Sequence, residues 1–159
     1  MKRILISLIA LVALTTAAQA QDNTFGVRAG YGAAFGAELS YQGFVSDINR
    51  IEIDLGARFG KKFVKDEVAV AYPTSAALSV MYHWHWFLVG GFGIYVGPGV
   101  QATIAGAGFG LGLGGQIGLD YPFDAPFQLS LDFRPMYALV GPYHLSLDNH
   151  VALGIRYAF

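Results

Sequence analysis

Residues 108–123 read GFGLGLGGQIGLDYPF, in which glycine alternates with large apolar residues. Glycine weakens a β-strand, because it has no side chain to pack and loses the most conformational entropy on folding. A segment that places glycine at alternate positions from Gly108 to Gly114 therefore has one small face and one apolar face. The alternation predicts a strand whose two faces meet different surroundings.

Period-two alternation recurs through most of the chain and predicts eight strands. Turn-forming residues separate several of them, as at 46–49 and 122–126. We interpret the charged run Lys61–Glu67 as a solvated turn. The predicted strands cover residues 25–32, 35–42, 51–59, 77–84, 91–104, 108–121, 127–134 and 151–159.

The charged residues of these segments fall on the small, polar face and never on the apolar face. An arginine or lysine that faces lipid at mid-depth costs about 2–4 kcal/mol, so a lipid-facing surface excludes charge. A water-facing sheet surface would be rich in lysine and glutamate, whereas this face is mostly Gly, Ala and Ser. The pattern favours a confined interior that contains a charge network of Arg28, Glu38, Glu52, Asp54, Arg58, Asp120, Asp132, Arg134 and Arg156.

The N-terminus has the features of a cleaved secretory signal peptide over residues 1–20. Lys2 and Arg3 precede an apolar run, and Ala18-Gln19-Ala20 gives a small-x-small cleavage pattern. The expected mature domain is therefore 21–159. Its apolar stretches are too short for a spanning helix, and the absence of cysteine excludes disulfides. With 10 basic and 11 acidic residues and no basic patch, nucleic-acid binding is not expected.

An exported, apolar chain without a spanning helix is typical of a barrel. We predict an all-β fold, a transmembrane eight-stranded antiparallel up-and-down β-barrel. A spanning strand needs about 9–11 tilted residues, and the mature chain accommodates eight such strands. Aromatic residues gather near segment ends, as expected for the belts at membrane interfaces, at Tyr41, Phe44, 82–87, Tyr121, Phe123, Tyr137 and Tyr143.

With this pattern the chain resembles the small OmpX-like and OmpA-like outer-membrane barrels of diderm bacteria. The ending 151–159 resembles the signal that the barrel-assembly machinery recognises, with Leu153, Ile155, Tyr157 and Phe159 at its alternate positions. The resemblance implies Sec export, periplasmic chaperones and the assembly machinery as biogenesis partners, and a monomer among outer-membrane lipid and lipopolysaccharide. It implies no cofactor.

Two interpretations of the lumen stay open from the sequence. Salt bridges among the lumen charges would close the bore and fix strand register, because buried ions must be paired. The glycines of 91–104 and 108–121 would instead allow a narrow channel or a small-ligand site. The first interpretation gives the chain a structural or interaction role without enzymatic activity.

Two weaker motifs suggest chemistry. His144 and Ser146 resemble the His-x-Ser pair of outer-membrane lipid A deacylases, a lipid A-modifying hydrolase family, although Ala158 stands near the family's glutamate position and only Asp148 is close. His83 and His85 share a strand face, but zinc wants three or four ligands. We interpret these two histidines as interfacial residues and expect no metal site.

Overall fold

The structure is a computed structural model that describes residues 23–32, 34–65, 68–72, 74–106, 108–124, 126–141 and 150–159, with the backbone alone for 61–65 and 68–72. No helix among these residues is long and apolar enough to cross a membrane. The strands are β1 (Thr24–Tyr31), β2 (Phe35–Phe44), β3 (Asn49–Phe59), β4 (Lys61–Lys65), β5 (Val68–Tyr72), β6 (Ser75–Phe87), β7 (Gly93–Ala105), β8 (Gly108–Pro122), β9 (Phe127–Arg134), β10 (Met136–Val140) and β11 (His150–Ala158).

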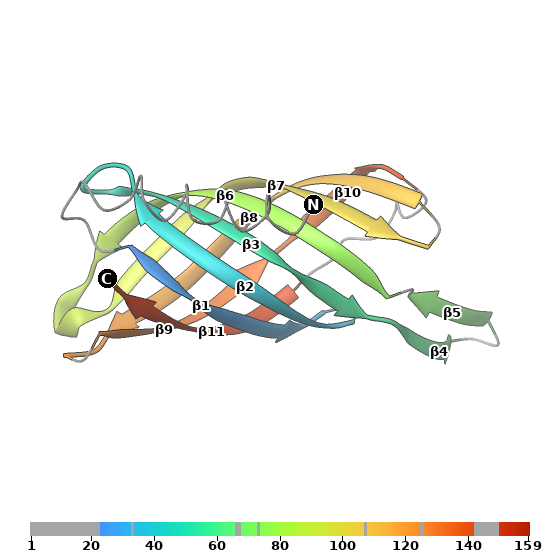
Figure 1. Cartoon of the computed structure of the whole chain (residues 1–159), viewed down its shortest axis with the longest axis horizontal. Helices are drawn as coiled ribbons and strands as arrows, with labels where there is room; N and C mark the ends of the chain where they lie inside the picture. The colour runs from blue at the N-terminus through green and yellow to red at the C-terminus, as the bar shows by residue number, and fades with distance from the viewer. Residues whose placement is uncertain are drawn as a thin grey trace, which may run out of the picture.

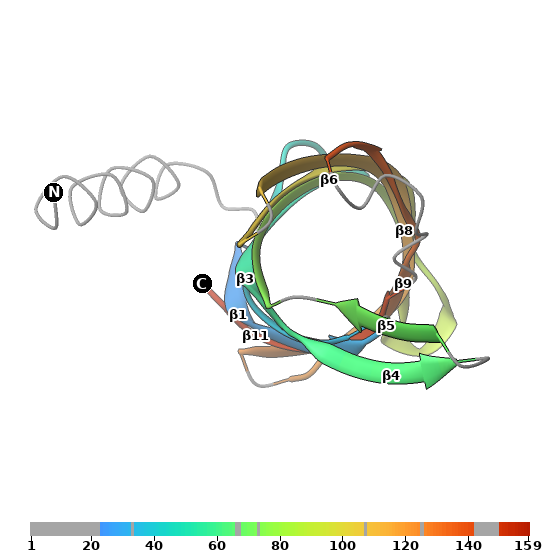
Figure 2. The same cartoon turned by 90° about the vertical axis from the view of Figure 1, so that its right-hand side faces the viewer.

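Eight of these strands close into a barrel, as predicted. Each is antiparallel to the next in the order β1, β2, β3, β6, β7, β8, β9 and β11, and β11 pairs with β1 to complete the ring. Figure 2 shows the ring nearly end on. β9 and β10 both pair with β8, one after the other along the chain. Pro135 separates them, because proline lacks the N–H needed for the hydrogen-bond ladder.

The two ends of the barrel differ. We call the end at which β1 begins and β11 finishes the terminal end, and the opposite one the hairpin end (Figure 1). The terminal end has short connections, including the 3-10 turn Val89–Gly91, in which Gly90 takes a φ of 83°. At the hairpin end, β4 and β5 pair with each other and project beyond the ring (Figures 1 and 2).

The prediction of a turn at Lys61–Glu67 is wrong over Lys61–Lys65, which form β4. The sequence around the charges contains Phe63 and Val64, and β5 contributes Val68 and Val70. These residue types favour extended backbone. Local strand propensity therefore outweighs the turn tendency of the charged run.

The faces alternate along each barrel strand. On β9 the side chain of Leu131 is 49% exposed, whereas its neighbour Asp132 is 2% exposed. In the barrel strands that the structure describes with side chains, no Asp, Glu, Lys or Arg lies at an outward position. The apolar set thus covers the outer surface and the charged set lines the lumen.

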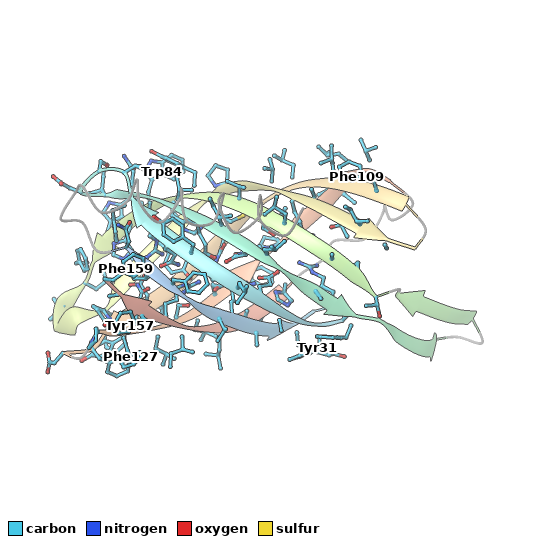
Figure 3. The ribbon with its side chains drawn as sticks, viewed as in Figure 1. Tyr31, Trp84, Phe109, Phe127, Tyr157 and Phe159 are labelled. Atoms are coloured by element: carbon cyan, nitrogen blue, oxygen red, sulfur yellow. The ribbon has the colours of Figure 1, made fainter. Side chains whose placement is uncertain are left out.

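Aromatic side chains mark both ends of the outer surface. Trp84, Phe127 and Tyr157 lie toward the terminal end, while Tyr31 and Phe109 lie toward the hairpin end (Figure 3). Phe109 and Tyr121 are twelve residues apart on β8. At about 3.3 Å per residue and a tilt of about 40°, that separation is about 30 Å along the axis. This matches the hydrocarbon thickness of a bilayer.

Candidate functional site

The lumen is crossed by a cluster centred on Arg134 of β9. Its Nη2 donates to Glu52 Oε1 of β3 at 2.7 Å and to Asp54 Oδ2, while Nε donates to Gln116 Oε1 at 3.0 Å. β3 and β9 are four strands apart by either route around the ring. These ion pairs therefore join opposite walls of the barrel.

Arg28 of β1 forms the second centre. Its Nη1 lies 2.6 Å from Glu38 Oε2, and its Nη2 and Nε both donate to the carboxylate of Asp132. Nη1 of Arg134 lies 3.5 Å from the same Glu38 oxygen, so the two centres share a carboxylate. Arg28 and Arg134 are fully buried, and pairing with several carboxylates is what makes buried guanidinium groups tolerable.

Arg156 of β11 joins this network from the terminal side. It donates to Ser130 Oγ at 2.6 Å and to Ser40 Oγ at 2.8 Å, and lies 3.3 Å from Glu52. Strand alternation turns these side chains toward the lumen, and the register between paired strands brings them to one level along the barrel axis. Positive and negative groups balance in the described lumen, which contains Arg28, Arg50, Arg58, Arg134 and Arg156 against Glu38, Glu52, Asp54, Asp120 and Asp132.

A separate cluster lies at the terminal end and includes Arg50, a residue that the sequence pattern did not predict. Arg50 is fully buried; its Nη1 donates to Asp120 at 2.7 Å, and its guanidinium lies 4.4 Å from the ring centroid of Tyr95. His85 Nε2 lies 3.1 Å from the same carboxylate. Arg50 was overlooked because the third strand was expected to begin at Ile51, although Arg50 lies two residues before Glu52 and so shares its face.

The interfacial interpretation of His83 and His85 is wrong. Both side chains point into the lumen and are buried, since β6 continues its alternation through the aromatic run to Phe87. Their outward neighbours Trp84 and Trp86 occupy the surface instead. Among the described residues, no group of three or more His, Cys, Asp or Glu side chains is arranged to hold a metal ion.

Arg58 lies closer to the hairpin end than Arg28 and Arg134 do. The hydrogen bonds described around Arg58 are with uncharged polar side chains. Its Nη2 donates to Gln101 Oε1 at 3.0 Å, and Ser79 Oγ lies 3.4 Å from the same oxygen. Gln101 Nε2 in turn donates to Thr103 Oγ1 at 3.1 Å. Gln101 thereby links β3, β6 and β7 across this part of the lumen.

Neighbouring side chains fill the space beside several glycines of the lumen wall. A Cβ at Gly118 would lie 2.5 Å from Tyr95 Oη, and one at Gly99 would lie 2.6 Å from Met81 Cε. Both distances are far below van der Waals contact, so glycine makes room for Tyr95 and Met81. At these positions the alternation of glycine with large apolar residues reflects the space that large side chains need inside a narrow barrel.

His144, Ser146 and Asp148, as well as Tyr143, lie outside the described residues. The hydrolase hypothesis therefore stays a prediction. Mass spectrometry of lipid A from cells that overproduce the protein tests it: a mass loss abolished by Ser146→Ala would support the hypothesis, and unchanged lipid A would refute it.

The predicted assembly-signal side chains lie on the outer surface. Leu153, Ile155 and Tyr157 alternate with buried Ala152, Gly154 and Arg156 along β11, and Phe159 follows the strand with 60% exposure. Tyr157 contacts Phe127 of the paired strand β9, with ring centroids 5.7 Å apart (Figure 3).

No family model and no curated protein matches the chain, whereas several solved structures share its fold. A major outer membrane protein from Thermus thermophilus is 13% identical with a TM-score of 0.66, over 89% of this chain and 100% of that one. Neisserial surface protein A is 12% identical with a TM-score of 0.59, over 87% and 96%. A de novo designed transmembrane β-barrel is 13% identical with a TM-score of 0.60, over 87% and 95%. The chain has the fold of the small eight-stranded transmembrane barrels.

Proposed function

We propose that the protein is an integral outer-membrane barrel whose lumen is closed by side chains, and that its role is structural or interaction-based. The observation that carries the proposal is the bridge from Arg134 on β9 to Glu52 and Asp54 on β3, the strand diametrically opposite. All three side chains are almost completely buried. A bridge between opposite walls leaves no straight path along the axis.

The surrounding contacts support closure. Arg28 spans from β1 to Asp132 on β9, and Arg156 spans from β11 to Ser40 on β2. An eight-stranded barrel has an interior that side chains can just fill. Removing these ions from water is costly unless every pairing forms, so the network also disfavours shifted strand registers.

The membrane environment and biogenesis are part of the proposal. The apolar outer surface and its two aromatic belts fit a bilayer, and the chain ending fits recognition by the barrel-assembly machinery. We place the protein in the outer membrane of a diderm bacterium, exported through the Sec pathway after removal of residues 1–20 and escorted by periplasmic chaperones. In the membrane it is a monomer in contact with lipid and lipopolysaccharide.

Conductance in planar lipid bilayers tests closure. The wild-type barrel is expected to give no stable single-channel steps. The triple variant Arg134→Ser, Glu52→Ser, Asp54→Ser removes the transverse bridge together with both of its carboxylates, and is expected to conduct. Leu131→Ala, on the outer face of β9, is the matched control. Stable wild-type steps that fall when Arg134 or Asp132 changes would refute closure and favour a channel.

A further inference from the structure

Both methionines of the expected mature chain lie in the lumen and belong to one row of paired residues. The chain contains three methionines, of which Met1 belongs to the predicted signal peptide. Met81 of β6 is paired with Gly99 of β7, which is itself paired with Gly114 of β8. Met136 of β10 is paired with Gly114 from the other side. Met81 is fully buried and Met136 is 3% exposed, so the row places two buried methionines on either side of two glycines.

The thioether of each methionine lies over the neighbouring glycine. A Cβ on Gly99 would clash with Met81 Sδ and would lie 2.6 Å from Met81 Cε. A Cβ on Gly114 would lie 2.7 Å from Met136 Sδ. The two side chains therefore extend along the lumen wall toward each other, from opposite ends of the row. On directly paired residues, Cβ positions are about 4.5–5.5 Å apart, so the two sulfur atoms lie over neighbouring positions of the wall.

This arrangement suits a metal ion held between two sulfur atoms. Metal–sulfur bonds are about 2.3 Å long, so an ion bound by two sulfurs holds them no more than about 4.6 Å apart, close to the spacing of paired positions. Methionine has three rotatable side-chain bonds, and the two glycines have no side chain that would stop the thioethers from adjusting. Thioethers are soft ligands, which select copper(I) over harder cations.

The groups around the row favour a monovalent ion. Glu52 of β3 is paired with Met81, and Asp54 follows on the same face of β3. Arg134 bonds both carboxylates, so their negative charge is already partly neutralised. Asp54 Oδ1 accepts no hydrogen bond among the described residues, which leaves this buried carboxylate able to compensate an added cation. Calcium and magnesium need several oxygen ligands, which a row of two thioethers and two glycines does not provide.

We propose that Met81 and Met136 bind one soft monovalent cation, copper(I), between their sulfur atoms. Each sulfur donates a lone pair to the ion, and nothing is oxidised or reduced on binding. Gly112 and Ala138, which follow the row on β8 and β10 toward the hairpin end, are half-buried, so the ion enters from that end. The site adds ion binding to a closed structural barrel and does not require conduction.

Nuclear magnetic resonance of the methionine methyl groups tests the site in the mature barrel, purified from membranes in detergent. The methionines are labelled with carbon-13 at the methyl group, so Met81 and Met136 give one signal each. Silver(I) is the probe, because it is a soft monovalent ion like copper(I) and keeps one oxidation state in air. We expect silver(I) to shift both signals together and to saturate at one ion per barrel, and calcium to shift neither.

Single substitutions show whether the two methionines share the ion. Met81→Leu and Met136→Leu keep most of the side-chain volume, so both variants should fold. Because the ion needs both sulfurs, each substitution should weaken silver(I) binding at the remaining methionine by about tenfold or more. This coupling distinguishes one shared ion from two separate contacts with single thioethers.

Leu113→Met is the matched control, because Leu113 is adjacent to Gly114 but lies on the outer face with 50% exposure. Its added methyl signal should stay unshifted at one silver(I) ion per barrel. The proposal is overturned if silver(I) shifts neither or only one of the two lumen signals, or if the remaining methionine of either leucine variant responds as in the wild type. Conductance is independent of this test, since a conducting barrel would refute closure whether or not the ion binds.

Discussion

Arg134→Met should be among the most destabilising single substitutions in the barrel. The arginine bonds Glu52, Asp54 and Gln116, and it also lies 3.5 Å from Glu38. Methionine preserves most of the apolar stem but leaves Glu52 and Asp54, which are neighbours on one face of β3, buried without the guanidinium group that bonds both of them. Removing one partner of a buried ion pair costs about 3–5 kcal/mol, because the remaining charge is uncompensated.

Urea unfolding of the protein refolded into lipid vesicles, followed by tryptophan fluorescence and by the gel mobility of the folded form, measures this cost. With a slope of about 2 kcal/mol per molar urea, a loss of about 4 kcal/mol lowers the midpoint by about 2 M. Phe133→Met is the control on the same strand, because Phe133 points outward and is 38% exposed. It should cost about 1 kcal/mol.

The double variant Arg134→Met, Asp54→Asn separates a lost ion pair from lost packing. Asp54 has Arg134 as its ion-pair partner, whereas Glu52 keeps a contact with Arg156 at 3.3 Å. Neutralising Asp54 should therefore recover about 1 kcal/mol or more of the loss, a coupling typical of residues in one network. A cost below about 1 kcal/mol for Arg134→Met, or additive effects in the double variant, would refute the reasoning.

The two faces of the barrel wall lead to three further predictions. Leu131→Arg, at mid-depth on the outer face, should lower the unfolding free energy by about 2–4 kcal/mol, whereas Phe127→Arg near the terminal end should lower it by about 0–1 kcal/mol. Equal costs for the two variants in vesicle unfolding would argue against a lipid-facing position for Leu131. Gly118→Ala should abolish or strongly reduce the folded fraction on gels, because its Cβ would lie 2.5 Å from Tyr95 Oη, whereas Gly110→Ala should fold normally. A larger folded fraction for Gly118→Ala than for Gly110→Ala would contradict the described filling of the lumen. Phe159→Ala should reduce assembly in cells but not refolding in detergent, because the side chain is 60% exposed and contributes little packing to the barrel. Heat-modifiable gel mobility measures both. Unchanged assembly in cells would exclude Phe159 from the recognition signal.

Much of the fold could be predicted because strand periodicity and the cost of charge in lipid constrain the same residues. Leu131 and Asp132 are adjacent in sequence, and only one of them can face acyl chains. The alternation therefore assigned faces as well as strands. Along β11, where apolar and small residues alternate without interruption, the expected and observed faces agree from Val151 to Tyr157.

The remaining features depend on information that periodicity does not contain. Arg50 follows a turn, so its place in the network depends on the residue at which β3 begins. The pairing of Arg134 with β3 depends on ring closure and strand stagger, which bring opposite walls together only in the complete barrel. The β4–β5 hairpin was missed because its lysines look like a turn while its apolar neighbours favour strands.

The central claim is that the outer face contacts lipid while the charged face is enclosed. The protein contains no cysteine, so a single cysteine introduced at each position from Phe127 to Arg134 can carry a spin label without interference. Accessibility to oxygen, which concentrates in the bilayer, should be high at Phe127, Leu129, Leu131 and Phe133 and low at the four positions that alternate with them. Uniform accessibility along β9, or high oxygen accessibility at Ser130 and Asp132, would contradict the account.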